Sequence, residues 1–396
     1  MPWGVVEIGK LLFNISAMAV DSSTQRISRL TPLDAVMVCV DAGVEPVTPR
    51  ACSLLSAQGR VLAVDVAASK LPPVSIALRD GFAVAAGAVA DASSYAPLRF
   101  TSPPRQVDAG EPMPEGADAV LPLDAVTFAG DRAEAIAAVA PGDGVLLAGG
   151  DSMPQTILRR AGAYLRASDI AVMTAGGIAD VTVREPRIRI ACGSMTKTPV
   201  VQAAVDMLTR AVTAAGGTVF NADTEPDRLY EALSEARAHA GFVVGGTGSG
   251  RGDASVRNLA KFGRVEAHGI AVSPGETAAF GFVGTRPVLL MPGRLDSALA
   301  IWLLVGRHIM TKLSGGHVDD TPRLLPLKRK VTSTIGLTEL VPVRYEDNSA
   351  EGTMADPLAS GYLSFEALTG SDGWIVVPAD SEGFAAGTQV AVRPWP

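Results

Sequence analysis

Between residues 187 and 315, short apolar segments of strand length alternate with segments of helical periodicity. Strands are expected at residues 187–192, 218–221, 242–244 and 287–291, and helices at 200–214, 228–240, 255–262 and 295–312. Such alternation favours a parallel sheet with helices on both faces. Ligands of such sheets bind in the crevice at the carboxyl ends of the strands.

One of these carboxyl ends leads into a glycine-rich loop. The expected strand 242–244 is followed by GGTGSGRGD, residues 245–253, and a helical pattern resumes near Ser255. Glycine permits positive φ angles and lets a ligand approach the backbone closely. Amide groups and the positive end of the helix dipole then favour an anionic or phosphorylated ligand. The alternative is a glycine-rich turn that binds nothing.

The spacing of this loop excludes two common nucleotide motifs. A dinucleotide fingerprint needs a third glycine where Arg251 or Asp253 stands. A P-loop ends in Gly-Lys-Ser/Thr, whereas residues 250–252 read GRG. The loop therefore predicts a bound anion without identifying it.

Composition limits the class of protein. The chain has 396 residues, of which 19% are charged and 47% hydrophobic, as in a folded chain of several domains. Its net charge of −7 argues against a nucleic-acid partner. The scattered cysteines, Cys39, Cys52 and Cys192, have no disulfide or zinc spacing, which favours the cytoplasm. The apolar stretches 5–20 and 298–305 predict neither a signal peptide nor a membrane span.

The pattern changes outside the alternating region. Helical spacing is expected within residues 28–56 and at 167–175, whereas the proline- and glycine-punctuated residues 57–148 favour short strands. A basic, proline-containing linker is expected at residues 322–330. Strands at 340–345, 373–377 and 389–392 then predict a small C-terminal barrel or sandwich.

A set of recognisable segments extends over nearly the whole chain, and the most specific are DAGEPMPEGADAVLP (108–122) and VGGTGSGRGD (244–253). The others are SRLTPLDAV (28–36), QGRVLAVDV (58–66), LPPVSIALRDGFAV (71–84), GGD (149–151), VREPRIRI (183–190), VSPGETAAFG (272–281) and MPGRLDSA (291–298). In their order and near-family spacing, these segments resemble the molybdopterin molybdenumtransferase family, which includes MoeA and the gephyrin E-domain.

The resemblance implies a multidomain α/β fold and a homodimer with the site between subunits. The central unit is expected to be a parallel α/β sheet domain of molybdopterin-binding type, accompanied by a β-rich insert domain and a C-terminal β-barrel. The implied boundaries are an N-terminal extension packing on the α/β domain (1–27), an elongated αβ segment (28–56 and 149–185), the insert (57–148), the α/β domain (186–321) and the barrel (322–396).

The resemblance also implies an activity in molybdenum cofactor biosynthesis. Family members insert molybdate into the dithiolene of adenylylated molybdopterin, with Mg²⁺ assistance and hydrolysis of the adenylyl group. Such a site needs an anion cradle and carboxylates that hold Mg²⁺. Molybdopterin, molybdate and Mg²⁺ are therefore the expected ligands of a cytoplasmic transferase, and a molybdoenzyme or a cofactor-biosynthesis protein is an implied partner.

Matching positions give a set of expected site residues. Asp80, Asp151 and Asp253 are the expected catalytic residues, and Asp80 and Asp253 the expected metal ligands. As ordinary structural residues, Asp253 would cap the helix at Ser255 and Asp80 would sit in a turn. The expected cofactor-binding residues are Ser194, Gly245, Gly246, Thr247, Gly248, Ser249, Gly250, Arg251, Pro274, Gly275, Pro292, Gly293 and Arg294.

The chain departs from the family at positions that carry chemistry. Acidic residues of the family are replaced by Ser75, Met195, Thr196 and Arg251, and Glu276 replaces a lysine. An arginine in the cradle can instead bind a phosphate through two parallel hydrogen bonds. Two functions stay open: an insertase that acts on molybdopterin, or a non-catalytic paralogue that binds molybdopterin or its finished cofactor as carrier or partner of a molybdoenzyme. A scaffold with a vestigial site is a third interpretation.

The four histidines have no spacing that indicates a site. His239, His268, His308 and His317 are therefore assigned no role.

Overall fold

The computed structural model describes residues 25–130, 132–193, 198–220, 229–316, 321–348 and 352–396. Residue contacts divide the chain into two compact units. The first comprises Met1–Pro46, Pro186–Leu313 and Val318–Pro396, and the second Val47–Glu185 and Ser314–His317. The apolar stretch 5–20 and most of the expected extension 1–27 lie outside the described residues. No helix in the described ranges is long and apolar enough to span a membrane.

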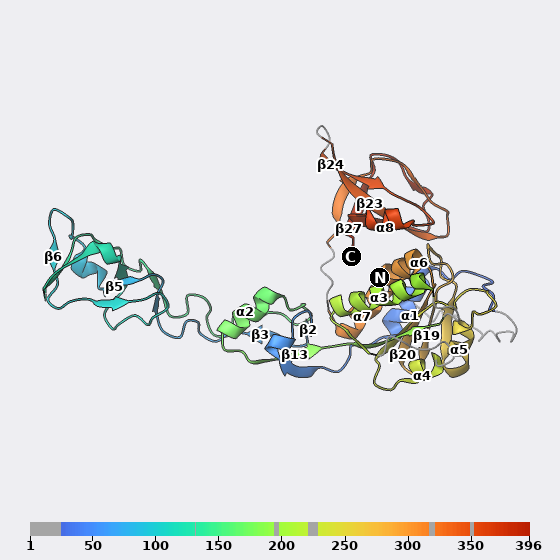
Figure 1. Ribbon diagram of the computed structural model, residues 1–396, viewed down its shortest axis with the longest axis horizontal. Helices are drawn as coiled ribbons and strands as arrows, with labels where there is room; N and C mark the ends of the chain where they lie inside the picture. The colour runs from blue at the N-terminus through green and yellow to red at the C-terminus, as the bar shows by residue number, and fades with distance from the viewer. Residues whose placement is uncertain (1–24, 131, 194–197, 221–228, 317–320, 349–351) are drawn as a thin grey trace, which may run out of the picture. The chain divides into compact units, whose positions relative to one another are not determined.

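A six-stranded sheet forms the centre of the first unit (Figure 1). Its order is β15 (Thr218–Phe220), β14 (Arg187–Cys192), β16 (Ala240–Val244), β20 (Arg286–Met291), β19 (Ala279–Val283) and β17 (Arg264–His268). The first four strands are parallel, as predicted, but β19 runs antiparallel to both of its neighbours, β20 and β17. The two residues between β19 and β20, with Gly284 at φ 62°, form a hairpin turn, and so short a connection imposes antiparallel pairing.

Helices cover both faces of this sheet. The strand β16 is buried throughout, which explains its uninterrupted apolar sequence. On one face, α4 (Leu229–Ser234) and α5 (Ser255–Phe262) pack on Val243 and Leu290. On the other, α3 (Pro199–Ala214) contacts α6 (Leu295–Ile301), and Trp302 meets the ring of Phe242 edge-on at 6.0 Å between centroids.

Most predicted helices are confirmed, with two differences. The predicted helix 228–240 is too long, because α4 ends at Ser234 and Ala240 already pairs with Ile188 in the sheet. The predicted helix 295–312 continues from α6 through a π-helical segment, η5 (Trp302–Gly306), into α7 (Arg307–Ser314). The helical spacing near residue 33 forms α1 (Leu33–Gly43).

The remaining part of the first unit is a second sheet. Its order is β18 (Val272–Ser273), β23 (Thr338–Asn348), β25 (Gly373–Val377), β27 (Gln389–Pro394) and β21 (Arg323–Pro326), with β24 (Gly352–Pro357) also on β23. The pair β22 (Val331–Thr332) and β26 (Gly383–Phe384) and the helix α8 (Phe365–Thr369) complete it. The predicted linker 322–330 is wrong because it contains β21 and the buried Leu325 and Leu327. Pairing of the described strands leaves the path from β18 to β21 open, so a closed barrel stays a prediction.

The second unit consists mostly of short strands, as expected for residues 57–148. The strands are β1 (Arg50–Ser53), β2 (Val61–Leu62), β3 (Val66–Ala67), β4 (Ile76–Ala77), β5 (Gly81–Val84), β6 (Leu98–Arg99), β7 (Arg105–Val107), β8 (Ala119–Leu121), β9 (Val126–Ala129), β10 (Arg132–Ala135), β11 (Val145–Leu146), β12 (Ile157–Arg159) and β13 (Asp180–Arg184). Two of the sheets have the orders β7–β5–β8 and β6–β10–β9, and a third has the order β1–β13–β2. The helix α2 (Ala167–Ala175) has the predicted bounds. The predicted division of the chain into four domains stays a prediction.

Candidate functional site

Three loops meet where the parallel strands β14, β16 and β20 end. The amide of Gly193, after β14, donates to Val244 O at 2.8 Å, and the amide of Gly245 donates to Met291 O at 2.8 Å. A Cβ on Gly293, after β20, would lie 3.5 Å from the Cα of Gly245. The expected cofactor-binding segments 245–251 and 292–294 are therefore brought together at one edge of the sheet.

Close backbone contact explains why glycine stands at position 246. Gly246 has φ 71°, and a Cβ there would lie 2.3 Å from the carbonyl oxygen of Gly193 and 2.4 Å from the hydroxyl of Ser255. That hydroxyl is buried and donates to Gly245 O at 2.9 Å. Any side chain at 246 would have to displace backbone, so this conformation of the loop requires glycine there.

A threonine and a histidine support the middle of the loop. Thr247 is 2% exposed, its hydroxyl lies 3.0 Å from that of Thr277, and its carbonyl oxygen lies 3.1 Å from His268 Nε2. Burial lowers the pKa of His268, so the ring is neutral at pH 7 and Nε2 carries the proton that it donates. No role was predicted for His268, because the spacing of the four histidines indicates no site.

The start of α5 is occupied by the side chain of Gln25. This residue is 3% exposed, although it lies near the N-terminus of the described chain. Its Nε2 donates to the carbonyl oxygens of Gly246 at 2.9 Å and Gly248 at 2.8 Å. Its Oε1 accepts from the amides of Val256 at 2.9 Å and Arg257 at 3.1 Å. The amides at the start of α5, which were predicted to bind an anion, therefore already have Gln25 as their hydrogen-bond acceptor. The sequence pattern did not indicate this role for Gln25.

The outer part of the loop is exposed and is stabilised by Asp253. Ser249, Gly250 and Arg251 are exposed. Asp253 Oδ2 accepts from the amide of Gly250 at 2.9 Å, and the Asp253 amide donates to Gly250 O at 3.0 Å. Asp253 therefore closes this turn and does not cap α5, whose N-cap residue is Ala254. Within the described part of the chain, Arg251 has neither a hydrogen bond nor an ion pair.

The other expected carboxylates belong to the second unit. Asp80 Oδ1 accepts from the amide of Ala109 at 2.8 Å, as a turn residue does. Asp151 is exposed, and its amide donates to Leu71 O at 3.0 Å. The described residues contain no group of three or more His, Cys, Asp or Glu that could hold a metal ion. A shared metal site of Asp80 and Asp253, which lie in different units, stays a prediction.

Arg79, next to Asp80, and Ser75, which replaces a family acid, also have structural partners. Arg79 pairs with Asp143 at 3.1 Å and donates to Val120 O at 2.6 Å. The hydroxyl of Ser75 accepts from the amide of Ala148 at 3.1 Å. Ser194, Met195 and Thr196 lie outside the described residues.

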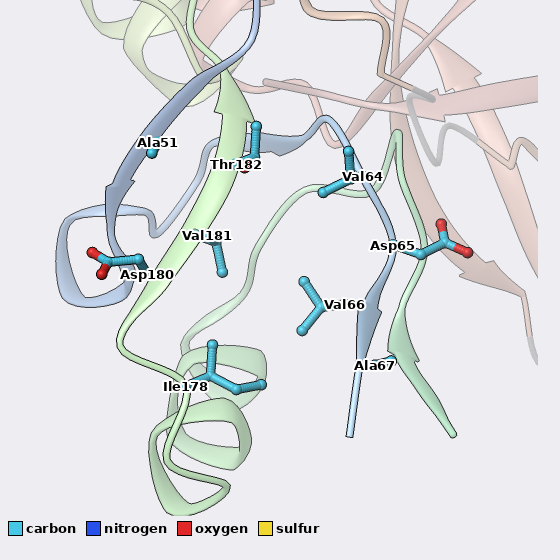
Figure 2. A pocket seen from close by; sticks show the side chains of 9 residues that line it. All are labelled: Ala51, Val64, Asp65, Val66, Ala67, Ile178, Asp180, Val181 and Thr182. Atoms are coloured by element: carbon cyan, nitrogen blue, oxygen red, sulfur yellow. The ribbon is translucent and has the colours of Figure 1, made fainter. Parts of the chain in front are cut away.

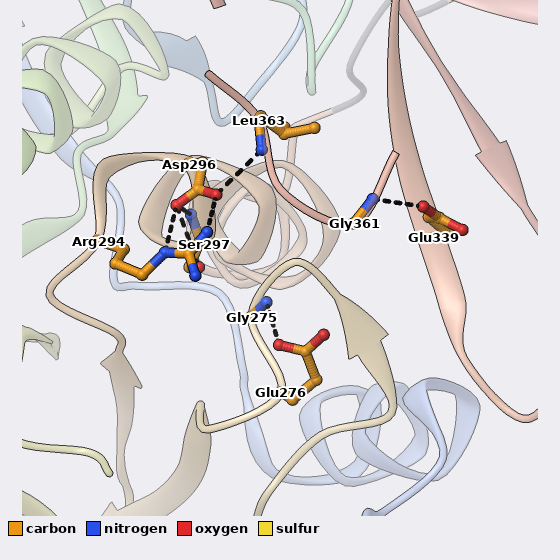
Figure 3. Close-up of polar contacts among 8 residues, drawn as sticks. All are labelled: Gly275, Glu276, Arg294, Asp296, Ser297, Glu339, Gly361 and Leu363. Carbon is orange, nitrogen blue, oxygen red and sulfur yellow. Dashed lines mark hydrogen bonds and ion pairs between the residues drawn. The ribbon is translucent and has the colours of Figure 1, made fainter. Parts of the chain in front are cut away.

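The turn at Pro274 and Gly275 is closed by its own glutamate. Glu276 Oε2 accepts from the amide of Gly275 at 3.1 Å, as Figure 3 shows. A Cβ on Gly275 would lie 2.9 Å from Ile301, so this turn packs tightly on α6. The acid that replaces a family lysine is thus used by the backbone of its own turn.

Arg294 is held by the start of α6 (Figure 3). Its Nε and Nη2 donate to Asp296 Oδ1 and Oδ2 at 3.1 and 2.5 Å, and its guanidinium lies 4.9 Å from the ring centre of Tyr362. The hydrogen bond to Asp296 raises the pKa of Arg294, so the side chain stays charged. Asp296 is 3% exposed and also accepts from the amides of Ser297 and Leu363, at 2.7 and 3.2 Å. Unlike Arg251, Arg294 already has a counter-ion.

A pocket of about 300 Å³ lies in the second unit, away from the sequence-predicted residues (Figure 2). Apolar side chains such as Val66, Ile178 and Val181 line its middle, with Asp65 and Asp180 at its edges. Asp65 Oδ1 already accepts from the amide of Ala161 at 2.8 Å. None of the expected site residues lines this pocket.

Comparison with known proteins identifies the family. Residues 18–177 match the MoeA N-terminal region (domain I and II), and residues 325–395 match the MoeA C-terminal region (domain IV). Together these regions cover more than half of the chain. The chain belongs to the MoeA family.

Individual relatives agree with this assignment. Molybdopterin molybdenumtransferase 1 of Mycobacterium tuberculosis is 28% identical over 291 residues, which are 68% of this chain and 66%, just under two thirds, of that relative. A protein of Methanocaldococcus jannaschii named for molybdopterin biosynthesis is 24% identical over 378 residues, 86% of this chain and 90% of its own length. The crystal structure of the molybdopterin biosynthesis moeA protein from Pyrococcus horikoshii OT3 has a TM-score of 0.70 at 23% identity, covering 93% of this chain and 100% of that one. The MoeA-family chain therefore has a MoeA-like fold.

Proposed function

We propose that this protein acts in molybdenum cofactor biosynthesis and binds molybdopterin at the glycine loop 245–253. The observation that supports this most is the meeting of three loop segments at the ends of β14, β16 and β20, where Gly246 leaves no room for a side chain. Such an edge is where open α/β sheets bind ligands. Membership of the MoeA family and the printed names of its relatives indicate the pterin class of ligand.

The reaction that we infer is molybdenum insertion into adenylylated molybdopterin, with molybdate as substrate and Mg²⁺ as metal. We expect Arg251 to bind a phosphate of the ligand, because it is an exposed residue of this loop. The other two carboxylates of the proposed Mg²⁺ site, Asp80 and Asp151, belong to the second unit. We propose that they reach Asp253 in a homodimer that has its site between subunits. Four domains, a C-terminal barrel and a cytoplasmic location belong to the same proposal.

A second candidate function is binding without turnover, as a carrier of molybdopterin or of the finished cofactor to a molybdoenzyme. The observation that favours it is that two of the three expected catalytic carboxylates are already used by backbone amides. Asp253 accepts from Gly250, and Asp80 accepts from Ala109. A carboxylate oxygen that closes a turn is less available to hold Mg²⁺ than a free one.

Complementation and titration separate the two candidates. A bacterial strain that lacks its molybdenum insertase is supplied with this protein at ordinary molybdate, and its accumulation is checked by immunoblot. Restored molybdoenzyme activity supports the insertase. Calorimetric binding of molybdopterin without restored activity supports the carrier. A well-accumulated, folded protein that neither complements nor binds molybdopterin would contradict both.

A further inference from the structure

The four hydrogen bonds of Gln25 define a site whose chemistry is not that of an anion cradle. Two amides, of Val256 and Arg257, point at one side of the site. Two carbonyl oxygens, of Gly246 and Gly248, point at the other. An anion would be attracted by the amides but repelled by the carbonyls. A group that satisfies these four backbone groups must have a hydrogen-bond acceptor facing the two amides and two N–H donors facing the two carbonyl oxygens.

The carboxamide of Gln25 has this pattern, and so does one edge of a pterin. A pterin ring presents an oxo group at position 4, an N–H at position 3 and an amino group at position 2, which give one acceptor followed by two donors. We propose that the backbone groups of Gly246, Gly248, Val256 and Arg257 form a binding site for this lactam edge, and that Gln25 occupies the site in competition with the ligand. The proposal rests on the proposed function, because that function supplies the pterin.

The segment that carries Gln25 is anchored separately from the site. Thr31 N donates to Gly269 O at 2.8 Å, and Ala271 N donates to Thr31 O at 2.8 Å. A Cβ on Gly269 would lie 2.5 Å from Ile27, so the chain between Gln25 and Thr31 packs closely on this turn. Gln25 can therefore leave the site while the segment stays attached at Thr31.

The carboxamide of Gln25 and the edge of a pterin ring are both neutral, so one can replace the other without burying a charge. Loss of the side chain would leave the amides of Val256 and Arg257 and the carbonyl oxygen of Gly248 without their partner, whereas Gly246 O would keep the amide of Ser255 at 3.0 Å. Backbone groups are rarely left unsatisfied when buried. A ligand edge replaces all four bonds at once. A ligand with the reverse order of donors and acceptors would replace none of them well.

The test is a fluorescence titration of free pterin against the full-length wild-type protein and its Gln25→Ala variant. If Gln25 fills the site most of the time, removing its side chain raises the apparent affinity by about tenfold or more. The matched control is Arg26→Ala, which removes the exposed neighbouring side chain and leaves the affinity unchanged. Equal affinities of the wild-type and Gln25→Ala proteins for pterin would overturn the proposal.

Two competing ligands test the shape of the edge. In 2,4-diaminopteridine an amino group replaces the oxo group, so the Gln25→Ala variant should bind it at least about tenfold more weakly than pterin. Guanosine presents the same edge as pterin on a different ring system and should bind more weakly than pterin. Equal binding of the diamino compound, or tighter binding of guanosine, would overturn the assignment to a pterin edge.

A second variant and a second ligand make the outcome independent of folding and of the proposed function. Gln25→Glu keeps the acceptor for the helix amides but sets an oxygen against two carbonyls, so its affinity for pterin should lie between those of the wild-type and Gln25→Ala proteins. If molybdopterin binds the wild-type protein while pterin binds neither variant, the edge site is wrong and the proposed function stands. If the Gln25→Ala variant binds pterin but no form binds molybdopterin, the edge site stands and the proposed function fails.

Discussion

The loops after β16 and β20 leave neighbouring strands at the same edge of the sheet, yet the helices that follow them begin in different ways. In the first turn of α5, the amides of Val256 and Arg257 are satisfied by the neutral side chain of Gln25, which is 231 residues from Val256 in sequence. The first turn of α6 is satisfied by its own Asp296, a buried charge paired with Arg294. Gln25 is neutral and distant in sequence, so a ligand can replace it, whereas Asp296 is charged and belongs to the turn that it stabilises. We therefore interpret the loop after β16 as a ligand-binding loop and the turn after β20 as a structural turn.

The largest expected effect on stability is at the structural turn after β20. Asp296→Ala removes the acceptor of Ser297 and Leu363 and leaves Arg294 without its counter-ion. We expect the first unit to lose about 2–4 kcal/mol of stability, discounted because Arg294 is partly exposed. Urea unfolding followed by tryptophan fluorescence reports this, since Trp302 and Trp374 are both buried in the first unit. The control Asp34→Ala removes an exposed first-turn acid of α1, and an equal loss in both variants would contradict the comparison.

The two arginines beside these loops should differ in ligand binding. Arg251 is exposed without a partner among the described residues, whereas Arg294 is balanced by Asp296. Arg251→Ala should weaken molybdopterin binding by about tenfold, or about 1.4 kcal/mol, through loss of a charge-assisted contact to phosphate. Arg294→Ala should change the affinity by less than about threefold. Calorimetry on both variants measures this, and the opposite ranking would place the anion at the β20 turn.

A smaller effect is expected at His268, which supports the loop from β17. Its pKa is lowered by burial, so the neutral ring is the form that the folded state favours. The resulting stability is present above the unfolded pKa of 6.5 and is lost as pH falls through the lower pKa of the folded state. His268→Ala should cost about 1 kcal/mol at pH 7.5 through loss of the bond to Thr247 O.

Urea unfolding at pH 7.5 and pH 5 measures this dependence. The wild-type protein should lose more stability between these two values than His268→Ala does, because the variant has no ring to protonate. If the variant loses as much as the wild-type protein, the titration of another group governs the pH dependence.

Local sequence predicted the elements whose patterns are complete within themselves. The buried face of α3, from Val201 to Val212, has the predicted spacing, and β14, α2 and α5 have the predicted bounds. The β19–β20 hairpin was not predicted, since a buried antiparallel pair and a buried parallel strand have equally apolar sequences. The strand β17 was not predicted either, although its sequence RVEAH alternates polar and apolar residues.

The sequence predicted where the loops of the candidate site lie, but it did not predict which side chains hold them. The glycines at the ends of β16 and β20 indicated where loops approach each other closely, because such positions exclude side chains. The partners of the loop, Gln25 and His268, are distant in sequence, and only the folded sheet brings them to Gly246 and Thr247. Asp253 was expected at a metal or a helix cap, but it bonds the amide of Gly250 three residues before it.

The central claim, that the glycine loop binds molybdopterin, is tested most directly by a calorimetric titration of Gly246→Ala. A Cβ there would lie 2.3 Å from Gly193 O, so the loop must change shape. Gly87→Ala is the matched control, because a Cβ at Gly87 has no atom within 4 Å. The wild-type and Gly87→Ala proteins should bind molybdopterin equally, and Gly246→Ala should bind at least about a hundredfold more weakly, or about 2.7 kcal/mol. Equal binding by all three folded proteins would contradict the claim.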